Sequence, residues 1–387
     1  MWRDYDDYTI SFLYYRGIVF FVSLCYTYYG SKGSISSMEK LCRKRESNFE
    51  LLRIISMIFI IFHHLIVHST YNFSLSNKVM ENDFFVALFQ SGGKFGVVLF
   101  VMITGYYMIN SNIKMKKLIL LEGQVLFYSI FIYFIFVFFM GKELVFSDLI
   151  TYLMPNINKV YWFFSSYFIL YLLISYINKL LLGLEKREYI RLLFIGFVFL
   201  ILLPTIFIFK ENVSGTIYLI YYYMIGAYIR LFGKEVKGAN NLLVGFILSY
   251  LAIPVISIYI KWLSLKNFYL KDYIFTFSEL DSIFVFVSSI CLFLFFKNLK
   301  IKYSRVINWL GSASFGVYLF HEHPLVRDFF FKRLFLTSQL IDSGFLLGSC
   351  IFITVFVYMS GTLFEVFRKG LAKVIKSYFK MLFSKST

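Results

Sequence analysis

All five histidines of this 387-residue chain lie in two short clusters, each at the end of a long apolar run. The first cluster holds His63, His64 and His68, and the second holds His321 and His323. Ionisable side chains are rare in segments apolar enough to cross a bilayer, and where they occur they mark candidate functional sites. Two clusters that are far apart in sequence but alike in setting predict one site assembled between two helices.

The first cluster shares a helix face with an arginine. Arg53 and His64 are 11 residues apart, which is about three helical turns, so they lie within about 20° of each other around the helix and about 16 Å apart along it. The stripe that faces the protein interior is predicted to run through Arg53, Met57, Ile60, His64 and His68. His63 lies to the other side and is predicted to be scaffold.

A histidine pair of this kind suits acid–base catalysis. The unperturbed pKa of histidine lies near neutrality, so a buried neutral ring can take a proton from a reacting group. We predict His64 as the general base and His321 as a group that orients it or polarises a reacting carbonyl. Ser314 and His321 are seven residues apart and share a helix face, with Tyr318 beside them.

Other polar and aromatic residues near the clusters have two readings each. Glu322 and His323 are either a salt-bridged helix end or part of substrate recognition. Tyr161 and Trp162 either pack against lipid and core or stack on a sugar, and His68 and Tyr318 are further candidates for substrate binding. His64 and His68 have the i, i+4 spacing of metal ligands, but no cysteine, and no carboxylate other than Glu322, is available to complete such a set, so no metal is predicted. The four cysteines are scattered, which indicates neither a disulfide nor a redox motif.

The elements that must position these residues are apolar helices. The chain is 59% hydrophobic and 16% charged, and runs of about 20 apolar residues recur along it. We predict an all-α polytopic membrane protein with about ten transmembrane helices, at 49–69, 95–110, 118–140, 160–181, 190–209, 215–233, 241–263, 279–297, 310–326 and 343–367.

The net charge of +17 is explained by topology rather than by nucleic-acid binding. With the segment before residue 49 placed in the cytoplasm, the inner segments carry more than twice as many Lys and Arg as the outer ones. This bias puts both ends of the helical body in the cytoplasm and favours contact with anionic membrane lipids. Arg53 then lies near the cytoplasmic face, where it is either a snorkelling anchor or a ligand for an anionic substrate.

The first 37 residues differ from the rest. An apolar stretch there is interrupted by Arg16, and Met38 opens a basic leader directly before the first strong helix. We predict that residues 1–37 are an extension from an upstream start, and that residues 38–387 form a single membrane domain.

Four motifs occur in the order expected of one family. The first is Ser47-Asn48-Phe49-Glu50-Leu51-Leu52-Arg53 followed by His63-His64, and the second is the run Gly96 to Tyr106. The third is Tyr161-Trp162-Phe163, and the fourth is Ser314-Phe315-Gly316-Val317-Tyr318-Leu319-Phe320-His321. Together they resemble the signatures of the acyltransferase-3 family of membrane-bound O-acyltransferases. The branch that acetylates bacterial cell-surface polysaccharides and exopolysaccharides is the most similar. Val98 and Thr104 depart from the second signature.

The resemblance implies an enzyme, an O-acyltransferase of the bacterial plasma membrane. Its donor would be cytoplasmic acetyl-CoA, used as a substrate with no permanently bound cofactor, and its acceptor a carbohydrate or a lipid-linked glycan. Arg53, Lys116 and Lys117 match the family's basic positions and would hold CoA, and polysaccharide-assembly proteins are candidate partners. One alternative is a transporter or flippase for lipid-linked sugars with a histidine proton relay. The lack of an internal sequence repeat disfavours this alternative. The other is a regulatory membrane protein with degenerate sites.

Overall fold

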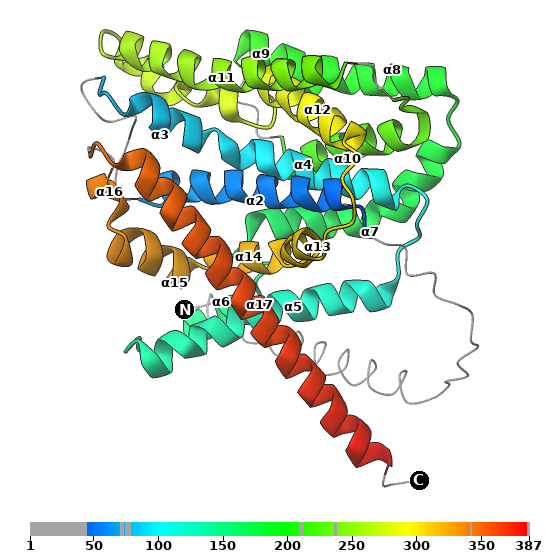
Figure 1. Cartoon of the computed structure of the whole chain (residues 1–387), viewed down its shortest axis with the longest axis vertical. Helices are drawn as coiled ribbons and strands as arrows, with labels where there is room; N and C mark the ends of the chain where they lie inside the picture. The colour runs from blue at the N-terminus through cyan, green and yellow to red at the C-terminus, as the bar shows by residue number, and fades with distance from the viewer. Residues whose placement is uncertain are drawn as a thin grey trace, which may run out of the picture. The chain divides into compact units, whose positions relative to one another are not determined.

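The computed structural model describes residues 45–69, 73, 79–208, 213–235, 238–340 and 343–384, and the predicted extension at 1–37 lies outside them. These described residues form helices and turns without a strand (Figure 1). The helices are α2 (Ser47–Val67), α3 (Asp83–Gln90), α4 (Gly92–Met108), α5 (Met115–Phe139), α6 (Phe146–Leu153), α7 (Trp162–Leu182), α8 (Lys186–Phe197), α9 (Leu203–Phe207), α10 (Gly215–Phe232), α11 (Ala239–Ser264), α12 (Ile283–Asn298), α13 (Arg305–Gly311), α14 (Ser314–His321), α15 (Pro324–Arg327), α16 (Thr337–Leu340) and α17 (Leu346–Ser384).

The prediction of an all-α polytopic membrane protein is confirmed. Within the described ranges, 8 helical segments are long and apolar enough to cross a membrane. Two of the ten predicted spans are not among them. The helix predicted at 215–233 is present as α10, but its tyrosines lower its mean hydropathy, and the segment 310–326 is not one helix.

The second span starts earlier than predicted. It was expected at 95–110, but helical structure begins at Asp83 and continues through α3 and α4 as a single apolar segment of 26 residues. Gly92, Gly93 and Gly96 lie inside α4, the first two of them ahead of the predicted start of the span. They allow it to pack closely on α2, since a Cβ at Gly96 would lie 2.5 Å from the carbonyl oxygen of Ser56.

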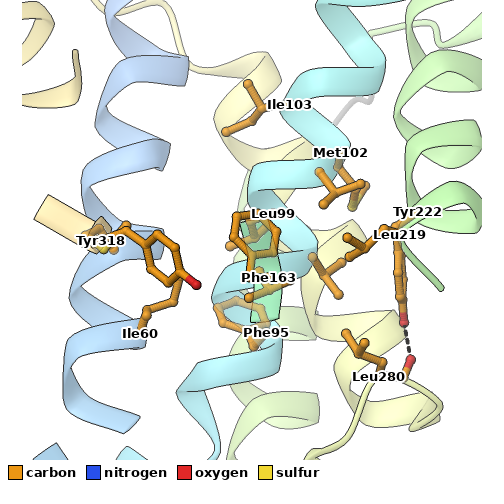
Figure 2. Packing of buried hydrophobic residues seen from close by; sticks show 14 of the residues in the cluster. Ile60, Phe95, Leu99, Met102, Ile103, Phe163, Leu219, Tyr222, Leu280 and Tyr318 are labelled. Carbon is orange, nitrogen blue, oxygen red and sulfur yellow. Dashed lines mark hydrogen bonds between the residues drawn. The ribbon is translucent and has the colours of Figure 1, made fainter. Parts of the chain in front are cut away.

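Helix α4 is the centre of the core, with α2 on one side and α10 on the other (Figures 1 and 2). The α4–α10 contact is a backbone-to-backbone approach, because a Cβ at Gly105 would overlap the carbonyl of Tyr223 and one at Gly226 would overlap the carbonyl of Met102. Buried aliphatic side chains such as Leu99 fill the space around this contact. Helix α2 is thus held against α4 on the side that carries Ser56, Phe59 and His63, while His64 contacts α14.

The start of α2 is fixed by hydrogen bonds to distant segments. Asn48 donates to the carbonyl of Phe296 at the end of α12 (2.9 Å). The Ser47 hydroxyl accepts from the backbone N–H of Ser304 (2.9 Å) and from the Asn308 amide (3.0 Å) at α13. These bonds set where α2 enters the helical body.

The predicted helix at 310–326 was wrong, because the segment is broken into α13, α14 and α15. Pro324 is the first residue of α15 and has no N–H to continue the hydrogen-bond ladder of α14. His323, the residue before it, has an extended ψ of 127°, as the proline ring requires. The break leaves His321 as the last residue of α14 and Glu322 just beyond it.

Candidate active site

The two histidine clusters meet as predicted. His64 Nδ1 on α2 lies 3.0 Å from His321 Nε2 at the end of α14. The same His64 atom lies 3.1 Å from Glu322 Oε2, and His68 Nε2 lies 3.2 Å from that carboxylate oxygen. We call His64, His68, His321 and Glu322 the histidine–glutamate cluster. All but His68 are buried, as expected for a site closed to lipid and bulk water.

The hydrogen bonds assign the protons in this cluster. His321 Nδ1 lies 2.6 Å from the carbonyl oxygen of Val317, and since a carbonyl can only accept, this nitrogen carries the proton. In the neutral ring, His321 Nε2 is then an acceptor, and the His64 Nδ1–H donates to it and to Glu322. The proton of neutral His64 is therefore held on Nδ1, and its Nε2 keeps the lone pair that a general base needs.

The carboxylate of Glu322 is placed to stabilise a positive charge on His64. Its Oε2 accepts from both His64 and His68, and its Oε1 faces the Arg327 guanidinium at 3.3 Å. Neither sequence reading of Glu322, a helix-end salt bridge or a substrate ligand, describes this arrangement fully. The pair with Arg327 is present, but the carboxylate also bridges the two histidines of α2.

The remaining histidines are held by backbone groups. His63 donates from Nδ1 to the carbonyl of Gln90, and its ring packs against Gly93, where a Cβ would collide with it. His323 Nε2 lies 3.1 Å from the carbonyl of Ser129, and its Nδ1 accepts from the N–H of Leu325. His63 thus links α2 to the α3–α4 segment, and His323 caps α15, with both of its ring nitrogens engaged.

The same three ligand atoms that form the hydrogen-bonded cluster could also bind a metal. One atom each from His64, His68 and Glu322 lies within 4.8 Å of the other two. A metal at this position would displace the proton on His64 Nδ1. Treatment with a chelator tests the prediction of no metal directly.

None of the predicted donor-binding residues belongs to the histidine–glutamate cluster. Arg53 is one end of a salt bridge to Glu50 (2.8 Å), whose other oxygen faces Arg45 at 3.5 Å. Arg53 is three turns of α2 from His64, about 16 Å along the helix. Lys116 and Lys117 are exposed in the first turn of α5. The i, i+3 spacing of Glu50 and Arg53 was a sequence signal for their contact that our prediction did not use.

The aromatic candidates lie against the second histidine cluster. The ring of Tyr318 is 6.3 Å from that of His321 and 6.1 Å from that of Tyr161, measured between centroids. Tyr161 and Tyr318 are buried, and Trp162 has the Lys94 ammonium 4.2 Å above its ring. Their predicted contact with a sugar stays a prediction.

The arrangement is a buried acid–base site: a neutral imidazole with a free lone pair, a second imidazole that fixes its tautomer, and a carboxylate that would stabilise its charged form. Neither the curated proteins nor the solved structures gave a significant match to this chain. The sequence profile of the acyltransferase-3 family, an acyltransferase domain, matches residues 46–364, which include every member of the cluster. The chain therefore belongs to the acyltransferase-3 family and is a multi-pass membrane acyltransferase.

Proposed function

We propose that this chain transfers an acetyl group from cytoplasmic acetyl-CoA to a hydroxyl of a bacterial cell-surface polysaccharide, an exopolysaccharide or a lipid-linked precursor. The observation that carries the proposal is the buried bond of His64 Nδ1 to His321 and Glu322, which leaves Nε2 as the basic nitrogen. The family match supports acyl transfer. The motif resemblance favours the acetyl donor and the carbohydrate acceptor.

The reaction follows from the proton positions. His64 Nε2 takes the proton from the acceptor hydroxyl, whose oxygen attacks the thioester carbonyl carbon and forms the new C–O bond. The C–S bond then breaks, and the proton on His64 passes to the departing thiolate, which gives free CoA and neutral His64. Glu322 stabilises the intervening imidazolium, while His321 is a positioning residue that holds His64 in the required tautomer.

The donor is proposed to lie along α2. Arg53, Lys116 and Lys117 would hold the phosphates of CoA on the cytoplasmic side, where the Lys and Arg bias places them. The thioester must reach His64, about three helical turns deeper. An extended acyl-CoA arm is therefore required between the phosphate site and the cluster.

The test compares two neighbouring histidines of α2. A His64→Ala strain should lose the O-acetyl signal from its surface glycans in NMR spectra, and its membranes should no longer transfer label from acetyl-CoA. A His63→Ala strain should retain both, because the hydrogen bond of His63 goes to the Gln90 carbonyl rather than to the histidine–glutamate cluster. If acetylation persists in the His64→Ala strain while glycan export fails, the protein is a transporter and the proposal is wrong.

A further inference from the structure

Acyl transfer also requires hydrogen-bond donors for the carbonyl oxygen, which becomes negatively charged as the acceptor attacks. The two central histidines have none to offer. His321 gives its N–H to Val317 and accepts at its other nitrogen, and the N–H of His64 is already directed at His321 and Glu322. The sequence-based suggestion that His321 polarises the carbonyl therefore does not fit its hydrogen bonds, and the donors must be other groups.

Two buried tyrosine hydroxyls beside the cluster lack a partner. Tyr161 and Tyr318 are 1% and 3% exposed, and neither hydroxyl makes a hydrogen bond to any described residue. A buried polar group left unpaired normally destabilises a fold by about 1–3 kcal/mol. Other buried tyrosines here avoid this, for example Tyr222, whose hydroxyl donates to the carbonyl of Leu280 (2.8 Å; Figure 2). Two unpaired hydroxyls at the site indicate a ligand that pairs with them.

The two tyrosines lie at the start of a long helix, α7. Tyr161 is the N-cap of α7, and the first N–H groups of a helix have no acceptor within it. The ring of Tyr318 lies 5.6 Å from that of Phe163 in the first turn of α7, and the Tyr318 hydroxyl points toward it (Figure 2). These N–H groups and the positive end of the helix dipole favour negative charge at this point.

The position of this group fits a reacting carbonyl. Tyr318 and His321 lie on α14 one turn apart, and His321 contacts the base His64. Tyr161 extends the same group toward His323, with 6.4 Å between ring centroids. A carbonyl oxygen bound by the hydroxyls would have its carbon beside the cluster that removes the acceptor proton.

We propose that Tyr318, assisted by Tyr161 and the N-terminus of α7, is the oxyanion hole of this enzyme. This inference rests on the proposed function. The Tyr318 hydroxyl donates a hydrogen bond to the thioester carbonyl oxygen, and the bond strengthens as the C=O electrons move onto that oxygen during attack. It persists until the C=O bond re-forms and the C–S bond breaks. No proton leaves the tyrosine.

The experiment uses the full chain with acetyl-CoA as the probe and compares Tyr318→Phe with Tyr222→Phe. Tyr318→Phe removes one oxyanion donor and should lower kcat about 100-fold with little change in KM for acetyl-CoA. Its thermal midpoint should stay the same or rise, because the lost hydroxyl had no partner. Tyr222→Phe should behave in the opposite way, with a lower thermal midpoint and an unchanged kcat, because it leaves the Leu280 carbonyl unpaired. Tyr161→Phe should show the Tyr318→Phe pattern more weakly.

Slow hydrolysis of acetyl-CoA in the absence of an acceptor distinguishes a role of the Tyr318 hydroxyl at the thioester carbonyl from a role at the acceptor. Hydrolysis passes through the same oxyanion, so Tyr318→Phe should lower hydrolysis and transfer by the same factor. A loss confined to transfer would assign the hydroxyl to the acceptor and overturn the inference, as would a folded Tyr318→Phe variant with wild-type kcat. Failure of the wild-type protein to use acetyl-CoA at all would instead reject the proposed function.

Discussion

Replacing Glu322 with glutamine tests the electrostatic part of the site with almost no change in shape. Glu322 Oε2 lies 3.1 Å from His64 Nδ1, which puts the carboxylate and the imidazolium charge centres about 4 Å apart. At an effective dielectric constant of about 20, their attraction is about 4 kcal/mol. Arg327 on the other carboxylate oxygen offsets part of it, and we take roughly 2–4 kcal/mol as the effect on the charged state.

This attraction exists only while His64 is charged, so it accelerates the reaction rather than binding of the substrate. Glu322→Gln should therefore lower kcat by roughly 30- to 1,000-fold and leave KM for acetyl-CoA nearly unchanged. The assay follows release of the CoA thiol with a thiol reagent, using the full chain in native membranes or detergent.

The matched control is Glu365→Gln. Glu365 is also a buried glutamate, and it accepts from the Tyr128 hydroxyl and from Arg368, each at 2.8 Å, outside the histidine–glutamate cluster. This variant should lose stability and keep kcat. A folded Glu322→Gln protein with kcat within about threefold of wild type would refute the electrostatic role assigned to Glu322.

Three further outcomes are expected. Treatment with a chelator should leave acyl transfer unchanged, because protons account for the bonds within the histidine–glutamate cluster; loss of activity with recovery on adding Zn²⁺ would show a metal site instead. Gly226→Ala should reduce the folded fraction in size-exclusion chromatography, since its Cβ would overlap the Met102 carbonyl. Gly123→Ala is the control, which should be neutral or stabilising because the space around Gly123 is open. Equal yields of the two variants would contradict the close contact between α4 and α10. Lys261→Met should lower the free energy of unfolding by about 3–5 kcal/mol, because it leaves the buried Asp83 carboxylate without its ammonium partner at 2.8 Å, and adding Asp83→Asn should recover much of the loss. A midpoint of thermal unfolding unchanged by Lys261→Met would count against that ion pair.

Even within one segment, local sequence signals did not always predict where a helix begins or ends. Pro324 is visible in the sequence, and the restriction that proline places on the residue before it was sufficient to end a helix at His321. We nevertheless predicted a continuous helix because the apolar run continues to Val326. At the second span, Gly92, Gly93 and Gly96 pack α4 closely on α2, and helical structure begins before residue 95, where we predicted its start.

The sequence by itself determined that the chain crosses the membrane many times, which family it resembles, and that Arg53 and His64 share one face of the first helix. These features follow from composition and from the fixed pitch of a helix, both of which are local. The tertiary structure alone decided what the histidines contact. His64 and His321 are 257 residues apart in the chain, and Glu322 reaches His64 because the helix breaks directly after His321. The two histidine clusters became one site with an assigned proton and an adjacent pair of unpaired hydroxyls. Such an arrangement depends on how separate helices pack, and helical periodicity within one segment carries no information about the position of another.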